Sequence, residues 1–141
     1  MCHMDESALF AHHARGCTIV AAKIWKNVVI YQNVTIGSNM RYNKPEKEWE
    51  NIGSPILAEG VIVSDGAKIL GPFIIGENTV IGAGTIITKD IQANSVAYGV
   101  NQYKPKNPEY DYVFNQNMIP GEKIMNVDEK RVAEFNKVLR G

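Results

Sequence analysis

Residues 57–91 read LAEGVIVSDGAKILGPFIIGENTVIGAGTIITKDI, and an aliphatic side chain returns in them every six positions. The series consists of Leu57, Val63, Ile69, Ile75, Ile81 and Ile87, and a second series four positions later consists of Val61, Ala67, Phe73, Thr79, Thr85 and Ile91. A period of six matches neither a helix nor a flat strand. It is typical of a solenoid whose coils are built from short strands and turns.

Short strands explain the spacing, because side chains two positions apart lie on the same face of a strand. Residues that suit corners fall between the paired aliphatic positions: Gly60, Asp65, Gly66, Gly71, Gly76, Asn78 and Gly82. Stacked coils would bury the aliphatic side chains in one continuous core. An ordinary meander of β-hairpins is the alternative, but hairpin lengths rarely keep one spacing over so many units. The sequence therefore predicts an all-β solenoid.

The same six-residue spacing is present before residue 57 and is then interrupted. Ile24, Ile30 and Ile36 follow the six-residue spacing, whereas Ile36 and Leu57 are 21 positions apart, which is not a multiple of six. Residues 38–54 are polar and contain Pro45, so we expect a loop that protrudes from the solenoid wall. A loop of this length is more often functional than idle, although a tolerated surface insertion stays possible.

Three segments are expected along the chain. Residues 1–11 form an N-terminal lead-in, either a partial coil or a loose terminus, residues 12–100 form the solenoid domain, and residues 101–141 form an extended tail and a helix. Asn126 or Asp128 can cap that helix. Its apolar stripe consists of Val132, Phe135, Val138 and Leu139. We expect this stripe to dock on the open end of the solenoid or on a neighbouring subunit.

Composition restricts the partners of the chain. The 141 residues carry 15 basic and 15 acidic side chains, and this balance argues against nucleic acid or an anionic membrane as the main partner. The two cysteines cannot form a disulfide framework. No apolar run is long enough to span a bilayer, and no secretory signal is visible. We therefore expect a cytoplasmic protein.

Three motifs resemble the hexapeptide-repeat acyltransferases, a family with the left-handed parallel β-helix fold. They are NVVIYQNVTIG (27–37), GAKILGPFIIG (66–76) and NTVIGAGTIITKDI (78–91). The sequence is most similar to the serine acetyltransferase branch and its relatives in polysaccharide gene clusters. The resemblance implies acetyl-CoA as the acyl donor and a homotrimer with active sites between subunits.

Acetyl transfer to a hydroxyl or amine needs a base, and neutral imidazole suits this role. The family places its catalytic histidine shortly before the motif that reads IYQNVTIG here, and His13 matches that position. The match requires one residue fewer than usual between Gly16 and Ile24, so His12 remains the alternative. The pair could also be simply solvated. The family's orienting aspartate has no clear counterpart here.

The resemblance also implies binding residues. The CoA arm corresponds to Asp65, Ala83, Thr88 and Lys89, with Lys104 and Lys106 near the nucleotide end, and the acceptor corresponds to Asn33, Arg41, Trp49 and Ser54. Ser54 stands where serine acetyltransferases have a histidine that contacts the acceptor, and this difference favours another acceptor. Trp49 could stack on a sugar ring, or it could pin the loop to the wall.

The favoured function is therefore an acetyl-CoA-dependent acetyltransferase that acts on a hydroxyl of a sugar or small metabolite. Serine O-acetyltransferase is one alternative, and a non-catalytic solenoid that binds partners is another. A zinc enzyme on the same fold would need spread histidine ligands, but His3, His12 and His13 all lie in the first 13 residues. We therefore expect no metal.

Overall fold

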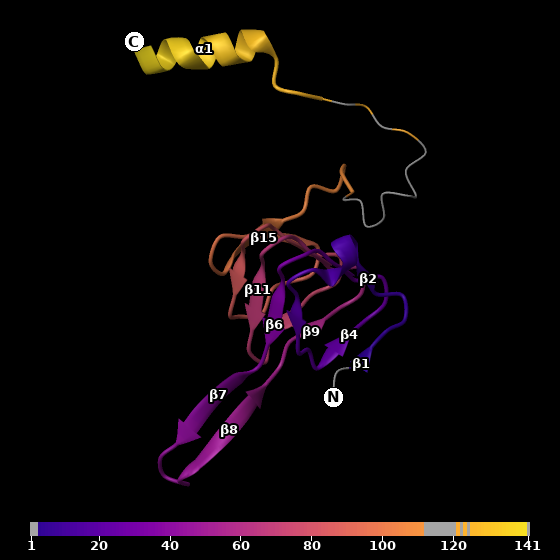
Figure 1. The fold of residues 1–141 in the computed structure, drawn as a ribbon, viewed down its shortest axis with the longest axis vertical. Coiled ribbons are helices and arrows are strands. Elements are labelled where there is room, and N and C mark those ends of the chain that lie inside the picture. The colour runs from indigo at the N-terminus through magenta and orange to yellow at the C-terminus, as the bar shows by residue number, and fades with distance from the viewer. Residues whose placement is uncertain (1–2, 112–120, 122, 124, 141) are drawn as a thin grey trace.

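The computed structural model describes residues 3–111, 121, 123 and 125–140. Short strands stack in parallel as three sheets around one core, as Figure 1 shows. The predicted all-β solenoid is confirmed, and its architecture is that of a left-handed parallel β-helix.

Each complete coil contributes one strand to each sheet. The first coil has β1 (His3–Met4), β2 (Leu9–Phe10) and β3 (Thr18–Ile19), and the second has β4 (Lys23–Ile24), β5 (Val29–Ile30) and β6 (Thr35–Gly37). The third has β9 (Ile56–Leu57), β10 (Ile62–Val63) and β11 (Lys68–Leu70), and the fourth has β12 (Ile74–Ile75), β13 (Val80–Ile81) and β14 (Ile86–Ile87). The first sheet has the order β1-β4-β9-β12, and the third has the order β14-β11-β6-β3.

The six-residue series lines the core as predicted. Its members are at most 2% exposed: Ile24, Ile30, Ile36, Leu57, Val63, Ile69, Ile75, Ile81 and Ile87. Two threonines of the second series are also buried, and their hydroxyls reach backbone oxygens: Thr79 Oγ1 donates to Gln92 O at 3.0 Å and Thr85 Oγ1 to Ala97 O at 3.5 Å. The inward position expected for Phe73 is wrong, because its side chain is only half-buried at a corner, beside Gly71.

At both ends the coil stack extends beyond the predicted bounds of the solenoid, residues 12–100. Residues 3–10 lie inside the predicted lead-in, but β1 pairs with β4 and β2 pairs with β5, so these residues form part of the first coil. At the other end, β15 (Ser95–Tyr98) joins the second sheet beside β13, and β16 (Gln102–Pro105) pairs with β15 in the antiparallel direction. The second sheet therefore has the order β16-β15-β13-β10-β5-β2.

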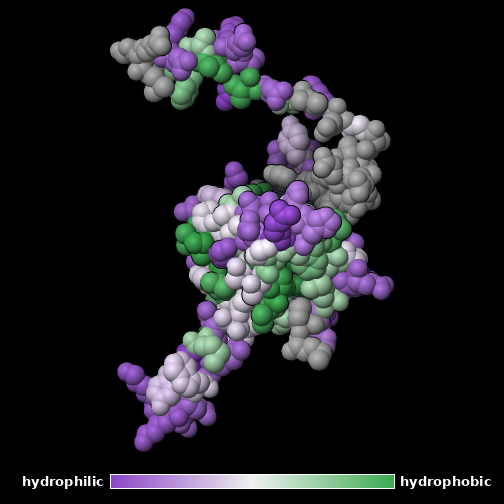
Figure 2. Space-filling view, viewed as in Figure 1, coloured by the Kyte–Doolittle hydropathy of each residue, from purple (hydrophilic) through white to green (hydrophobic). Residues whose placement is uncertain are grey.

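The segment expected as a protruding loop contains a β-hairpin. β7 (Asn39–Asn43) and β8 (Glu48–Gly53) form a separate two-stranded sheet that projects from the solenoid in Figure 1. Figure 2 shows hydrophilic side chains over the tip of this hairpin, and both hydrophobic and hydrophilic patches over the solenoid.

Helix α1 (Glu129–Arg140) begins after Asp128, whose Oδ1 accepts a hydrogen bond from Arg131 N at 2.8 Å. Figure 1 places α1 apart from the solenoid, and Val132 and Phe135 are exposed. The predicted docking on the chain's own solenoid is therefore not observed among the described residues. The side chains of Val138 and Leu139, and residues 112–120, 122, 124 and 141 of the tail, lie outside them. No described helix has the length and apolar character needed to cross a membrane.

Candidate active site

The two neighbouring histidines lie in a turn of unusual backbone conformation. The turn η1 (Ala11–Ala14) joins β2 to β3, and φ is +53° at His12, +58° at His13 and +55° at Ala14. Each L-residue in this left-handed region costs about 1–2 kcal/mol, so three in succession persist only where the surroundings hold them. Strained backbone of this kind clusters at functional sites. We call residues 11–14 the histidine turn.

Both imidazoles are exposed on the single chain. The ring of His12 lies 6.0 Å from the ring of Tyr31, measured between centroids. Arg15 N donates to His12 O at 3.3 Å, and Cys17 N donates to Ala14 O at 3.1 Å. These bonds close the histidine turn and leave the imidazoles available to a substrate.

Backbone hydrogen bonds connect the histidine turn to the corners of the later coils. Asn33 N donates to Arg15 O at 2.8 Å, Gly66 N donates to Gln32 O at 3.2 Å, and Gly84 N donates to Asp65 O at 2.8 Å. These bonds stack the corners between the second and third sheets, at residues 11–17, 31–34, 64–67 and 82–85. We call this column the histidine corner. It brings together four predicted site elements: the histidine pair, Asn33, Asp65 and Ala83.

Gln32, at the same corner, was missed by the sequence analysis. Its Oε1 is buried and has no hydrogen-bond partner among the described residues. An unpaired buried acceptor costs about 1–3 kcal/mol, so a donor other than the described residues, such as water or a ligand, would stabilise it. Its place between Tyr31 and Asn33 in the quoted YQNVTIG motif was the available signal.

Other predicted residues lie at the corner between the third and first sheets, which we call the hairpin corner because β7 and β8 leave the solenoid there. Thr88 N donates to Asn101 Oδ1 at 2.6 Å, and Asn101 Nδ2 donates to Thr88 Oγ1 at 2.7 Å. Lys89 Nζ lies 5.4 Å from the ring centroid of Tyr103. At the same corner Ser54 lines a cavity of about 560 Å³ together with Val20 and Asn51.

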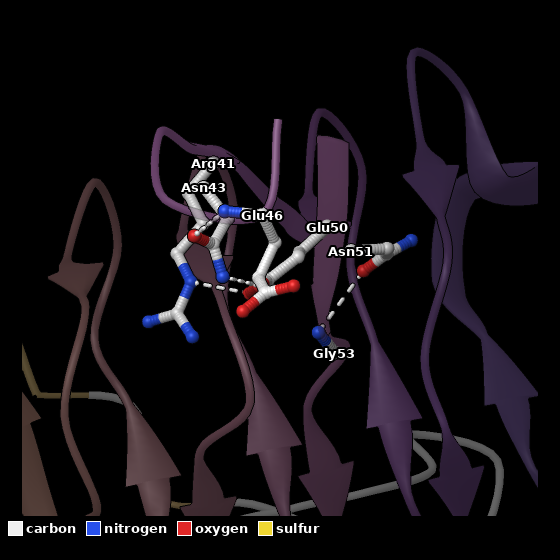
Figure 3. A network of polar contacts seen from close by, with 6 residues as sticks. All are labelled: Arg41, Asn43, Glu46, Glu50, Asn51 and Gly53. Atoms are coloured by element: carbon white, nitrogen blue, oxygen red, sulfur yellow. Dashed lines mark hydrogen bonds and ion pairs between the residues drawn. The ribbon is translucent and has the colours of Figure 1, made fainter. Parts of the chain in front are cut away.

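The hairpin has two faces of different chemistry. On one face, shown in Figure 3, Arg41 Nε lies 2.9 Å from Glu50 Oε2, and Asn43 Nδ2 donates to Glu50 Oε1 at 2.6 Å. The Asn43 hydrogen bond and then Arg41 lower the pKa of Glu50 below its ordinary value. On the other face the rings of Tyr42 and Trp49 lie 5.2 Å apart, and Trp49 is 71% exposed. Arg41 and Trp49 therefore do not converge on one ligand.

The two predicted phosphate lysines lie on β16 or directly after it. Lys104 lies on β16, with Nζ 5.9 Å from the ring centroid of Tyr98. Lys106 Nζ donates to Asn78 O at 3.0 Å, and its backbone N donates to Asn94 O at 2.8 Å. Asn78 and Asn94 belong to the remaining corner, between the first and second sheets, which we call the asparagine corner. Asp65 and Ala83, Thr88 and Lys89, and Lys106 thus lie at three different corners of one chain, whereas Lys104 lies on a strand.

The repeats themselves match a known model. Residues 54–89 match the family described as bacterial transferase hexapeptide (six repeats). This stretch of the chain is therefore similar to bacterial transferase hexapeptide repeats. The chain is 36% identical over 94 residues to a serine acetyltransferase of Mycobacterium tuberculosis, and the alignment covers 65% of the chain and 38% of that relative.

Solved structures of serine acetyltransferases are also similar to the chain. A Neisseria gonorrhoeae serine acetyltransferase in complex with serine aligns with a TM-score of 0.60 and 26% identity, over 74% of the chain and 39% of that structure. A serine acetyltransferase in complex with CoA aligns with a TM-score of 0.54 and 28% identity, over 67% of the chain and 35% of that structure. The chain thus spans less than two fifths of these relatives.

We next consider metal binding in the part of the chain that the structure describes. No group of three or more histidine, cysteine, aspartate or glutamate side chains is placed there to hold a metal ion.

Proposed function

We propose that this protein is an acetyl-CoA-dependent O-acetyltransferase. The observation that carries the proposal is the strained histidine turn, which presents two imidazoles at one corner of a hexapeptide-repeat solenoid. The similarity of this solenoid to serine acetyltransferases supports acetyl transfer over the alternative of a non-catalytic scaffold. A donor such as acetyl-CoA agrees with the expectation of a cytoplasmic protein.

In the proposed reaction the acceptor oxygen attacks the thioester carbonyl carbon of acetyl-CoA. The imidazole of His13, or of His12 as the alternative, takes the proton from the acceptor hydroxyl as the new C–O bond forms. The tetrahedral intermediate then loses the CoA sulfur as the C–S bond breaks. The imidazolium returns its proton to that sulfur, so the products are the acetyl ester and CoA.

L-Serine is the first acceptor that we propose, although Ser54 replaces the histidine expected in serine-specific relatives. The named relatives and the complex with serine support this choice. The unpaired Gln32 Oε1 supports it as well, because the ammonium group of serine could donate to a buried acceptor at the histidine corner.

A sugar hydroxyl is the second candidate acceptor, and it rests on the exposed aromatic face of the hairpin. Tyr42 and Trp49 offer an apolar platform, and Asn51 lies at the base of the hairpin beside Ser54. A sugar ring combines an apolar face with polar edges, which suits such a platform. Trp49→Ala should then raise KM for a sugar acceptor at least about tenfold and leave KM for serine unchanged.

We also propose a homotrimer with the active sites between subunits. In one chain the histidine turn and the pair Thr88 and Lys89 lie at different corners, so one chain does not collect them. A ring of three copies would set the histidine corner of one subunit beside the hairpin corner of the next. A solution mass of three 15.7 kDa chains by light scattering is the expected result.

The decisive experiment measures CoA release by thiol trapping, with serine and a panel of nucleotide-linked sugars as acceptors. His13→Ala should abolish turnover while the circular dichroism spectrum stays unchanged, and His12→Ala should retain it. The reverse result would assign the base to His12, and full turnover in both variants would reject a histidine base. Acetyl-CoA should also raise Tm by linkage, and no shift at millimolar ligand would favour the scaffold.

A further inference from the structure

We propose that Asn33 and Asp65 form a clamp that positions the histidine turn, instead of binding the acceptor and CoA directly. The inference rests on the proposed function for its kinetic part, and on geometry alone for its structural part. Asn33 lies in the second coil, directly above the chain that leaves the histidine turn, and Asp65 lies in the third coil. The clamp therefore spans three successive coils of the histidine corner.

The contacts of Asn33 account for this role. Its backbone N donates to Arg15 O at 2.8 Å, one residue after the histidine turn. Its side-chain Oδ1 packs against Gly16, where an added Cβ would overlap it. Its Nδ2 donates to Asp65 Oδ1 at 3.3 Å, and its carbonyl oxygen accepts from Lys68 Nζ at 3.1 Å. The backbone N and O and the side-chain Nδ2 of Asn33 are thus hydrogen-bonded, and its Oδ1 lies against Gly16.

Asp65 fixes which way this amide points. A carboxylate only accepts hydrogen bonds, so it must face the Nδ2 of Asn33 and leave Oδ1 on the side of Gly16. Asn33 also has a left-handed backbone, with φ +57°, which asparagine tolerates better than most residues. A rigid support of this kind is what three strained residues in succession require.

A second corner of the same chain provides a matched control. At the asparagine corner, Asn78 has φ +56°, its Oδ1 lies 2.6 Å from the position of an added Cβ on Gly60, and its Nδ2 donates to Asn94 Oδ1 at 3.5 Å. The arrangement repeats Gly16, Asn33 and Asp65, but its acceptor is an amide, and no turn of consecutive left-handed residues adjoins Gly60. If the asparagine side chain only stabilises a corner, its removal should therefore have the same effect at the histidine corner and at the asparagine corner.

The structural test compares Asn33→Gly with Asn78→Gly in the full chain. Glycine keeps the left-handed backbone and removes only the side chain. Hydrogen exchange at the amides of Arg15 and Cys17, which close the histidine turn, should accelerate at least about tenfold in Asn33→Gly and stay unchanged in Asn78→Gly. Equal exchange in both variants would overturn the clamp, whether or not the protein turns over any acceptor. The failure of the proposed function is thus distinguishable from the failure of the clamp.

The kinetic test asks whether the clamp affects the rate of acetyl transfer. Moving the base by about 1 Å from its productive position can lower the rate on the order of a hundredfold. Asp65→Ala should therefore lower kcat about ten- to a hundredfold with KM for acetyl-CoA unchanged, and Asp65→Asn, which can still present an oxygen, should restore most of kcat. A rise in KM for acetyl-CoA with kcat intact would instead assign Asp65 to CoA binding and overturn the proposal. If Asn33→Gly does not fold, Gly16→Ala against Gly60→Ala gives the same comparison.

Discussion

Left-handed residues at the corners of the solenoid are mostly of the type that tolerates this conformation. Asn27, Asn33, Asn78, Asn94 and Asn101 all have positive φ. Asparagine compensates locally with its short amide, whereas alanine has no such compensation. The histidine turn is therefore the place where the corner backbone departs from what its residues prefer.

Ala14→Gly should stabilise the protein for this reason. Glycine reaches the φ of +55° found at Ala14 without steric cost, although it loses more entropy on folding. We expect the free energy of unfolding to rise by about 0.5–1 kcal/mol in urea titration. Ala58→Gly, at a corner position without positive φ, is the control and should lower it by a similar amount. A loss of stability in Ala14→Gly would show that the turn is not strained in solution.

At the scale of one strand, two consecutive residues of β14 point to opposite faces of the solenoid wall. Ile87 is fully buried in the core, and Ile86 is 39% exposed on the outer face. Ile87→Ala should lower the free energy of unfolding by about 2–5 kcal/mol, because it leaves a cavity between coils. Ile86→Ala should cost less than about 1.5 kcal/mol. Denaturant titration of the two variants checks the inward assignment, and equal losses would contradict it.

The hairpin carries a separate prediction on pH. The pKa of Glu50 is lowered by the Asn43 hydrogen bond and by Arg41, so its contribution to hairpin order is complete above the ordinary carboxyl pKa. That contribution is lost as the pH falls through the lower pKa of the folded state. In a Trp25→Phe background, the near-UV circular dichroism of Trp49 should fade over this acidic range.

Glu50→Gln should abolish this pH step, since the amide does not titrate there. Glu48→Gln, on the same strand, should keep it. A step that survives in Glu50→Gln would assign the titration to another carboxyl group.

The core was predictable from sequence because inward positions depend only on local spacing, whereas the hairpin was not. Residues 38–54 read as a polar loop, since Tyr42 and Trp49 become neighbours only when β7 and β8 pair. A further apolar cluster, Val29, Ile62 and Val80, lies on the outer face of the second sheet and was also missed. Periodicity identifies the inner series, but it gives no reason for an outer one.

At the scale of the molecule, the placement of site residues on corners follows a spacing that the sequence does contain. Ile62 pairs with Val80 and Lys68 with Ile86, so positions 18 apart lie above each other in successive coils. Asp65 and Ala83 therefore share a corner, and Thr88 belongs to the next one. Between the first two coils the spacing varies: it is 20 where His3 pairs with Lys23 and Leu9 with Val29, and 17 where Thr18 pairs with Thr35. What the spacing does not supply is how residues at different corners would meet, and for this we propose a neighbouring chain.

The last prediction concerns the hairpin as a part of the whole molecule. β7 and β8 pair only with each other, and Asn39 and Gly53 close the hairpin at its base. Replacing residues 40–52 by a short Gly-Ser linker should thus shift Tm by less than about 4 °C, because the stacked coils that carry stability are untouched. Calorimetry measures the shift, and light scattering on the same sample reports the assembly. A trimer that falls to single chains on excision, with Tm retained, would make the hairpin an element of assembly, whereas unfolding would contradict the independence of the solenoid.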